Sequence, residues 1–324
     1  MQSTTALSEI IRLLQGSQHV LMFTHISPDG DAIGSLLGLG WLLQGQGKAT
    51  TLVDADPVPA ELRHLPGAGQ IIAEPPRARW DAVVALDASD AQRLGPSFHP
   101  TEYGDAPIIV IDHHITNQRF GAFNLIEPAA AATAQVLVQL ADAWPVPITQ
   151  PAATCLLAGL VTDTRGFRTS NVTIEVMATA MRLMEDGANL AEIAERSLDY
   201  KPLGLMRLWG LALAGVQVDG RIIWTQITQA MRDQVQALNG NDGGLVSFLL
   251  NAPEANVAVV FSEKRDGRVE VSLRSRPGFD VSGLALDLGG GGHPQAAGCS
   301  ITGPLADVEA RVLAAIRGVK RTEG

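Results

Sequence analysis

The sequence predicts an α/β protein in which an N-terminal domain with a parallel sheet precedes a smaller C-terminal α+β domain with a mixed sheet. Three observations lead to this prediction. Short apolar runs at 19–24, 82–86 and 108–111 have the length and composition of strands buried on both faces. An apolar helical segment follows the first run, as in a βαβ unit. Beyond residue 216, strand patterns are paired across Asp-Gly dipeptides, which is typical of hairpins.

The first part of the chain alternates helical and strand patterns, as parallel sheets require. In order, we expect a helix at 3–15, strands at 19–24 and 49–53 with a crossover helix at 32–46 between them, strands at 82–86 and 108–111, and helices at 130–143 and 152–160. Pro145 and Pro147 mark the turn between the last two helices. Asn171 is the expected N-cap of a further helix that ends near residue 185.

Two helical stretches broken by Pro202 fill residues 186–215, and we expect them to connect a catalytic domain at 1–185 to a substrate-binding domain at 216–324. In the second domain, turns at Asp219-Gly220 and Asp266-Gly267 predict two hairpins. Clefts between domains are frequent ligand sites, so the active site is expected in the cleft between these two.

Composition agrees with a globular protein of two domains. The chain has 324 residues, of which 46% are hydrophobic, enough for two cores. Its two cysteines, Cys155 and Cys299, stand in apolar surroundings and are expected to be small core residues of a reducing cytosol rather than nucleophiles. The N-terminus lacks the pattern of a signal peptide, and no apolar run approaches the length of a membrane span. We expect a cytoplasmic protein.

Four segments place Asp or His where a strand is expected to run out into a loop. They are THISPDGDAIGS, VVALDASD, IIVIDHH and LAGLVTDTRGF. One such residue would most often be a turn residue or a helix cap. Four of them carry more weight, because the carboxyl ends of parallel strands share one edge of the sheet, and ligands bind at that edge.

These segments supply mixed nitrogen and oxygen donors for metal ions. The donors are His25, Asp29, Asp31, Asp87, His113 and Asp163. Six donors suit two divalent ions with a shared carboxylate better than one tetrahedral site. Manganese, cobalt and zinc accept such a mixture, whereas magnesium and calcium favour oxygen alone, and manganese is the ion we expect. Two ions roughly 3.5–4 Å apart can hold an attacking hydroxide and neutralise phosphoryl oxygens, which indicates hydrolysis of a phosphate ester or anhydride.

The DHH tripeptide, with H-x-x-x-D-x-D upstream and D-T-x-G-F downstream, resembles the DHH phosphoesterase superfamily. The resemblance implies a role for each donor. The first metal would be held by His25 and Asp29, the second by Asp31, His113 and Asp163, and Asp87 would bridge the two.

The resemblance also implies that His114 faces the scissile phosphate or its leaving group. Asp112 then resembles a carboxylate that orients a metal-binding imidazole. Asp90 has no role that the sequence supports.

The segment GGGGHPQAAG, from Gly289 to Gly298, resembles the glycine-rich substrate motif that accompanies the DHH core in nanoRNases and single-strand exonucleases but not in family II pyrophosphatases. Backbone N–H groups at Gly290, Gly291 and Gly292 could approach phosphate oxygens closely, and His293 could add a donor. A flexible linker is the alternative. The position between an apolar helix at 281–288 and an apolar run at 296–301 favours a packed motif.

Four arginines are candidate phosphate contacts. Arg274 and Arg276 are expected on one face of a strand, where they could grip phosphate or could be a solvated pair on an edge strand; the resemblance favours substrate contact. Arg165 stands where the family usually has a small residue after Asp-Thr, so the sequence does not determine the geometry of that loop. Arg168, three residues later, is the fourth candidate.

The net charge of −10 argues against a long nucleic acid as substrate, because polymers are usually gripped by a basic surface. The charge thus favours short substrates, and the resemblance to the nanoRNase branch implies a manganese-dependent exonuclease that acts on short RNA or DNA oligonucleotides and dinucleotides and also as a phosphatase of adenosine bisphosphate (pAp). The family often forms homodimers. A small-anhydride hydrolase such as a pyrophosphatase and a non-catalytic nucleotide sensor remain as alternatives, and the sequence ranks neither the substrates nor the strand polarity.

Overall fold

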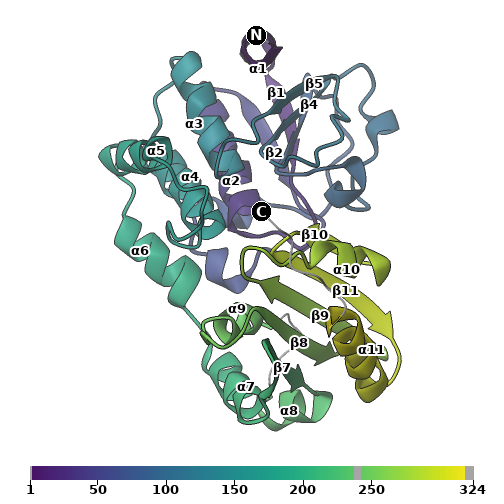
Figure 1. Cartoon of the computed structure of the whole chain (residues 1–324). Helices are drawn as coiled ribbons and strands as arrows, with labels where there is room; N and C mark the ends of the chain where they lie inside the picture. The colour runs from purple at the N-terminus through teal and green to yellow at the C-terminus, as the bar shows by residue number, and fades with distance from the viewer. Residues whose placement is uncertain (1, 237–241, 318–324) are drawn as a thin grey trace. The chain divides into compact units, whose positions relative to one another are not determined.

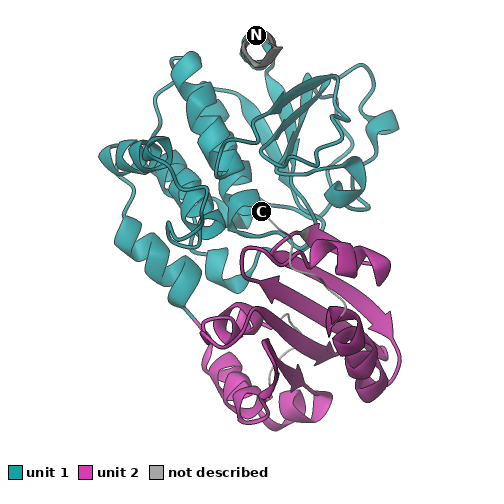
Figure 2. Ribbon diagram, viewed as in Figure 1, with its two compact units in different colours: residues 1–200 teal, residues 201–324 magenta. Residues whose placement is uncertain are grey.

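The computed structural model describes residues 2–236 and 242–317, with the side chains of 2–5 and 293 excepted, and the chain divides into two compact units, residues 1–200 and 201–324 (Figure 1, Figure 2). The helical connector expected at 186–215 is thus shared between the units. The first unit contains a five-stranded sheet whose strands are all parallel, in the order β2-β1-β3-β4-β5. These strands are β1 (His19–Phe23), β2 (Ala49–Val53), β3 (Ala82–Leu86), β4 (Ile108–Asp112) and β5 (Phe123–Ile126).

The parallel sheet confirms the predicted fold class. The chain runs from β1 to β2 on one side and then crosses to β3 on the other, so the strand order reverses between β1 and β3. Ligands of open α/β sheets bind at such a reversal, outside the carboxyl ends of the strands. Strand β5 was not expected, because it has only four residues, of which one is Asn124 and two are half-buried.

Helices of the first unit cover one face of the sheet and loops cover the other (Figure 1). The helices are α1 (Gln2–Gly16), α2 (Gly30–Gln44), α3 (Thr133–Ala143), α4 (Gln150–Asp163), α5 (Ile174–Glu185) and α6 (Leu190–Ala194), which continues as a π-helical turn at Glu195–Asp199. Short 3₁₀ turns lie at Ala60–Leu62, Ala68–Gln70, Ala91–Leu94 and Pro100–Glu102. The loop face holds an aromatic group in which the rings of Phe23 and Phe98 meet edge to face, 5.2 Å apart.

Two local expectations were wrong. Helix α5 is capped by Thr173 rather than by Asn171, because Thr173 directly precedes the helix and its hydroxyl accepts the N–H of Val176. Asp163 does not follow a strand, since it is the last residue of α4. The apolar run before it is buried against α2 rather than inserted in the sheet.

Helices α2 and α4 pack backbone against backbone through a stripe of glycines. Gly30, Gly34 and Gly38 recur every four residues along α2, which places them on one helix face. A Cβ atom on Gly34 would lie 2.5 Å from the carbonyl oxygen of Cys155 in α4, so no larger residue fits there. This close approach sets the first turn of α2 beside the last turn of α4.

The second unit contains a mixed six-stranded sheet in the order β10-β11-β9-β8-β7-β6, in which only the pair β7 and β8 is parallel. The strands are β6 (Gln217–Asp219), β7 (Ile222–Ile227), β8 (Val257–Glu263), β9 (Arg268–Ser275), β10 (Gly291–His293) and β11 (Ala296–Thr302). The helices are α7 (Leu203–Ala214), α8 (Gln229–Gln234), α9 (Leu245–Leu249), α10 (Ser282–Asp287) and α11 (Leu305–Arg317). Both predicted hairpins, β6-β7 and β8-β9, are present.

Both cysteines are buried and free, and burial raises the pKa of each thiol, which agrees with their expected role as core residues. Within 2–236 and 242–317, no helix has both the length and the apolar character that a membrane span needs.

Candidate metal centre

The candidate ligands gather at the carboxyl ends of β1, β3 and β4, next to the reversal of strand order. His25 follows β1, Asp87 follows β3 directly, and Asp112 ends β4 before His113. Asp29 and Asp31 lie at the start of α2, and Asp163 lies at the end of α4. In the part of the chain that the structure describes, three groups place ligand atoms within 4.8 Å of one another: His25, Asp29 and Asp87; Asp31, His113 and Asp163; and Asp87, His113 and His114.

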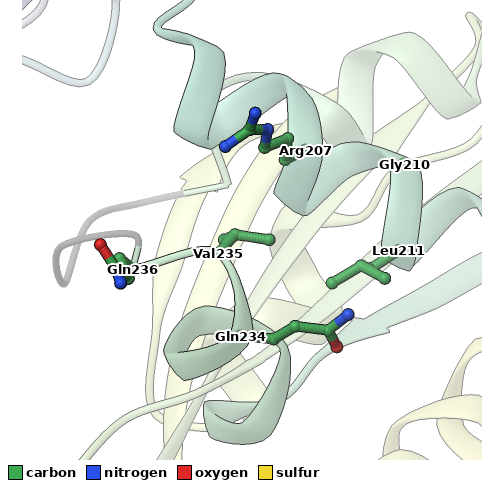
Figure 3. A pocket seen from close by; sticks show the side chains of 6 residues that line it. All are labelled: Arg207, Gly210, Leu211, Gln234, Val235 and Gln236. Carbon is green, nitrogen blue, oxygen red and sulfur yellow. The ribbon is translucent and has the colours of Figure 1, made fainter.

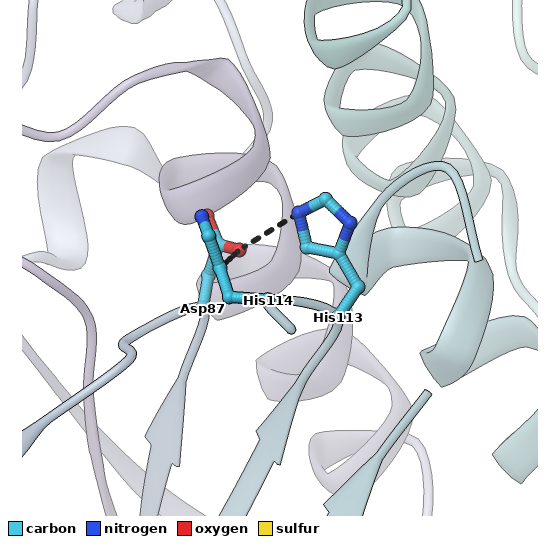
Figure 4. Close-up of side chains that lie close together, drawn as sticks. All are labelled: Asp87, His113 and His114. Atoms are coloured by element: carbon cyan, nitrogen blue, oxygen red, sulfur yellow. Dashed lines mark ion pairs between the residues drawn. The ribbon is translucent and has the colours of Figure 1, made fainter. Parts of the chain in front are cut away.

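Asp87 belongs to the first group and also faces the second. Its Oδ2 is 3.6 Å from Nε2 of His25, and its Oδ1 is 3.7 Å from Nε2 of His113 (Figure 4). The residue has a φ of +56°, in the left-handed region. Such strain in a residue other than glycine tends to accumulate at functional sites. The backbone therefore turns at once after β3, and the side chain, which is 2% exposed, enters the centre.

Asp31 is buried and held at the N-terminus of α3. Its Oδ2 accepts the N–H of Thr133 at 2.6 Å, and its Oδ1 accepts the N–H of Ala134 at 3.0 Å and the hydroxyl of Ser35 at 3.1 Å. The free N–H groups and dipole of a helix N-terminus stabilise a carboxylate. Oδ2 of Asp31 remains 4.0 Å from Nε2 of His113, so a cation between them could still be bound.

Asp29 and Asp163 are the more exposed members of the two ligand groups. Asp29 is the N-cap of α2, and its Oδ1 accepts the N–H of Asp31 and of Ala32. Its side chain is 61% exposed. Asp163 is brought within 3.5 Å of Nε2 of His113 by the glycine packing of α2 on α4.

His25 presents one ring nitrogen to the carboxylates and the other to the protein. Nδ1 lies 2.9 Å from the carbonyl oxygen of Ile26 and 3.1 Å from Nη2 of Arg93. When Nδ1 donates to that carbonyl, the lone pair of Nε2 faces Asp87 and is available to a cation.

Asp90, which had no role in the sequence argument, caps the 3₁₀ turn that carries Arg93. Its Oδ1 accepts the N–H groups of Gln92 and Arg93. Sequence reasoning missed Arg93; its only signal was its place three residues after the aspartate cap of a turn.

His114 is oriented by Asp112. Nδ1 of His114 donates to Oδ1 of Asp112 at 2.7 Å, while Oδ2 of Asp112 accepts from Asn117 at 2.6 Å. Asp112 is fully buried, and the ring of His113 instead contacts the carbonyl oxygen of Ala130 at 3.2 Å. The imidazole that Asp112 orients is therefore that of His114.

The electrostatics of the centre fit a bound cation. Burial lowers the pKa of His25, but Asp87 and Asp29 outweigh this and raise it to about 9. For the acidic Asp87, burial acts in the opposite direction and would raise the pKa. The neighbouring imidazoles nevertheless hold the pKa of Asp87 well below its ordinary value. Burial and then the charges of Asp87 and Asp163 raise the pKa of Asp31 well above its ordinary value. Carboxylates crowded in this way are stabilised in their ionised form by a divalent ion.

Asp163 and His114 titrate under the same influences. Burial raises the pKa of Asp163 to about 7, although His113 opposes the shift. For His114, burial acts to lower the pKa, and the hydrogen bond to Asp112 raises it to about 9.

A fourth buried carboxyl group lies near the centre and was not among the predicted residues. Asp54 directly follows β2, is 2% exposed, and accepts the N–H of Asp56. Burial raises its pKa to about 7, with His25 acting in the opposite direction. Its signal in the sequence, an aspartate directly after an apolar strand, was the same as that of Asp87.

The glycine-rich segment is a β-hairpin, not a linker. Gly292 in β10 has a φ of +140°, and a Cβ atom there would lie 2.5 Å from the carbonyl oxygen of Ala296. A Cβ atom on Gly290 would lie closer still to the carbonyl oxygen of Gly298. His293 pairs through its backbone with Ala296, and its side chain lies outside the described residues.

The candidate arginines have different surroundings. Arg274 lies in β9, half-buried, on the face opposite to Val271 and Leu273. Arg276 lies beyond the end of β9, and its guanidinium donates to the carbonyl oxygens of Leu250, Ala252 and Ala255. The two therefore do not share one face of the strand, because β9 ends at Ser275.

Arg165 and Arg168 lie on the exposed loop after α4. Arg165 adopts a φ of +52°, followed by Gly166 at +72°, so the chain turns tightly here although Arg165 carries a side chain. Nε of Arg168 donates to the carbonyl oxygen of Arg165 at 2.6 Å.

A hollow of about 480 Å³ lies in the second unit, between α7 and the end of α8 (Figure 3). Its lining residues are Arg207, Gly210, Leu211, Gln234, Val235 and Gln236. None of these belongs to the candidate metal centre.

Comparison with known proteins identifies both units. Residues 19–160 match the DHH family, N-terminal domain, and residues 223–321 match the DHHA1 domain. The chain is 38% identical, over 318 residues, to the bifunctional oligoribonuclease and PAP phosphatase NrnA of Thermus thermophilus. The alignment covers 96% of this chain and 92% of the relative. The chain belongs to the DHH family. Within the family it falls in the NrnA branch, and the corresponding protein of Bacillus subtilis is 24% identical, with 91% of this chain and 93% of that protein covered.

Solved structures support the DHH fold. An exopolyphosphatase-related protein from Bacteroides fragilis superposes with a TM-score of 0.90 at 22% identity, covering 97% of this chain and 96% of that one. RecJ from Thermus thermophilus, solved in complex with Mn²⁺, superposes with a TM-score of 0.55 at 16% identity, covering 98% of this chain and 55% of that one. At these identities the likeness concerns the fold.

Proposed function

We propose that this protein is a metal-dependent phosphodiesterase that degrades short oligonucleotides and dinucleotides to mononucleotides and also dephosphorylates pAp. The observation that carries the proposal is the pair of neighbouring ligand groups at the reversal of strand order, because Asp87 belongs to one group and its Oδ1 faces His113 of the other. The names of the NrnA relatives, which cover nearly the whole chain, support the substrate class.

The donor set fits two divalent ions. His25 and Asp29 would hold one, Asp31, His113 and Asp163 the other, and Asp87 would contact both through its two oxygens. We propose Mn²⁺, because the set mixes imidazole and carboxylate donors. RecJ, which shares the fold, was solved with Mn²⁺ and also with Mg²⁺. When bound, such a pair activates water and neutralises charge on a phosphoryl group.

Other predicted residues of the two units have proposed roles toward the leaving group and the substrate. His114, held by Asp112, would stabilise or protonate the departing oxygen. We propose that the backbone of Gly290, Gly291 and Gly292, together with His293 and Arg274, binds the nucleotide end, and that Arg165 and Arg168 are further phosphate contacts. For Arg276, the hydrogen bonds to three carbonyl oxygens support a role in holding the loop after α9 as well.

The net charge of −10 supports short substrates rather than polymers. A homodimer in the cytoplasm is part of the proposal, and size-exclusion chromatography with light scattering tests the dimer. The hairpin formed by the glycine-rich segment argues against a pyrophosphatase, and the complete set of six donors argues against a non-catalytic sensor.

A parallel assay tests the proposal. The purified protein with Mn²⁺ is given a labelled RNA dinucleotide, a long single strand, pAp and pyrophosphate, and His113→Ala serves as the control for contaminating activity. We expect turnover of the dinucleotide and of pAp, little turnover of the long strand, and none by the variant. A preference for the long strand or for pyrophosphate, or full activity in the variant, would contradict the proposal.

A further inference from the structure

Thr133 connects two carboxylates of the metal centre. It is the first residue of α3 and is completely buried. Its backbone N–H donates to Oδ2 of Asp31 at 2.6 Å, and its hydroxyl donates to Oδ1 of Asp87 at 2.8 Å. Asp31 lies on α2 and Asp87 follows β3, so one residue links ligands from two other elements.

The hydroxyl has no part in building α3. The residue at the N-cap position is Ala132, whose side chain makes no capping bond, and the first N–H groups of the helix donate to Asp31 instead. A hydroxyl at the first helical position would ordinarily be free to point to solvent. Here it is buried, and burial of a hydroxyl is unfavourable unless it has a partner. That partner is Asp87, so the hydrogen bond serves the carboxylate rather than the helix.

The hydrogen bond controls how the carboxylate of Asp87 is rotated about its Cβ–Cγ bond. Oδ2 faces His25, and Oδ1 faces His113, so each oxygen serves a different ligand group. Rotation of the carboxylate would turn both oxygens away from these directions. Because a carboxylate oxygen has two lone pairs, Oδ1 can accept from Thr133 and still bind a cation.

We propose that Thr133 is a positioning residue that locks the orientation of Asp87 and thereby sets the metal affinity of the centre. This inference rests on the metal centre of the proposed function but not on the substrate. The effect is larger at the group of Asp31, His113 and Asp163, because Thr133 contacts the oxygen of Asp87 that faces this group and also binds Asp31.

Two substitutions separate the hydroxyl from the rest of the side chain. Thr133→Val keeps the shape and the N–H bond to Asp31 but removes the donor to Asp87. Thr133→Ser keeps the donor and removes the methyl group. Mn²⁺ binding is measured by isothermal titration calorimetry and by the loss of the free-ion signal in electron paramagnetic resonance. We expect binding in Thr133→Val to weaken by about 10–100-fold, the range for partners of metal ligands, and to remain near the wild-type value in Thr133→Ser.

Thr179→Val is the matched control. Thr179 is half-buried on α5 and its hydroxyl donates to the carbonyl oxygen of Glu175, so the same substitution leaves the metal centre untouched. We expect its Mn²⁺ affinity to equal that of the wild type. If Thr133→Val does not fold, Thr133→Ala compared with Thr133→Ser makes the same test, since both lack the methyl group and only serine keeps the donor.

Wild-type Mn²⁺ affinity in Thr133→Val would overturn the inference. Equal weakening in the serine and valine variants would overturn it too, because the methyl group rather than the hydroxyl would then matter. The proposed function is tested separately: a wild-type protein that binds Mn²⁺ but hydrolyses neither a dinucleotide nor pAp would refute that function and leave the role of Thr133 standing.

Discussion

Gly159 of α4 is in direct contact with Asp31 of α2: a Cβ atom on Gly159 would lie 2.7 Å from Oδ1 of Asp31 and 2.9 Å from Cβ of Ala134. Both distances are well inside van der Waals contact. The glycine therefore leaves the space that the Asp31 carboxylate occupies between α4 and the N-terminus of α3.

Gly159→Ala should lower both stability and metal affinity. Alanine in a helix interior ordinarily stabilises by about 1 kcal/mol relative to glycine. Here the added methyl group displaces Asp31, and overpacking of this kind costs about 1–3 kcal/mol. Urea unfolding and Mn²⁺ titration of the purified variant measure the two effects.

Gly210→Ala in α7 is the control, because a Cβ atom there meets nothing within 4 Å. We expect this variant to be as stable as the wild type or more stable. A stabilised Gly159→Ala protein with normal Mn²⁺ affinity would show that Asp31 is not confined as described.

Asp54→Asn should stabilise the metal-free protein at neutral and alkaline pH. Burial raises the pKa of Asp54 from 3.8 to about 7 in the folded state. Between these values the unfolded chain releases a proton that the folded protein retains, so this group lowers stability as the pH rises from 4 to 7. The full effect above pH 7 is at most about 4 kcal/mol, from about three pKa units.

The measurement is urea unfolding in a chelator at a series of pH values. The stability difference between Asp54→Asn and wild type should be small near pH 4 and grow up to pH 7. Asp199→Asn, an exposed position, is the surface control. Parallel curves for wild type and Asp54→Asn over this range would refute the raised pKa.

Mn²⁺ should stabilise the wild type against unfolding, because the folded centre gathers the ligands and the unfolded chain does not. At a free ion concentration 100 times the dissociation constant, the gain is about 2.7 kcal/mol. In Asp87→Ala the gain should largely disappear, since this carboxylate faces both ligand groups. Thermal unfolding with Mn²⁺ and with chelator provides the comparison; an unchanged gain in the variant would remove Asp87 from the metal site.

Arg276→Ala should lower the stability of the protein, whereas Arg274→Ala should weaken substrate binding. Arg276→Ala removes donors from three backbone carbonyls and is expected to cost about 1–3 kcal/mol of stability. Arg274→Ala should leave stability nearly unchanged and raise KM for a dinucleotide, in line with the proposed phosphate contact. Unfolding curves and steady-state kinetics on both variants decide the matter. A destabilised Arg274→Ala with normal KM would reverse the assignment.

Much of the fold and of the candidate site was predictable because the signals are local. The apolar runs of β3 and β4 are buried on both faces and therefore show no alternation, and a ligand follows each one directly. The two Asp-Gly turns predicted the two hairpins, because a turn of this kind is also a local signal. Strand β5 and the cap Thr173 escaped prediction, because a four-residue strand and a choice between neighbouring polar residues leave little local signal.

By itself the sequence determined which residues carry donor atoms and that β1, β3 and β4 would deliver several of them to one edge. Tertiary structure alone decided how these donors are held. Asp163 reaches His113 from a helix end because glycines let α2 and α4 approach closely. Thr133 meets Asp87 and Asp31 across 46 and 102 residues of chain. Contacts of this range depend on how elements pack, and the sequence does not show which residues of two distant elements will meet.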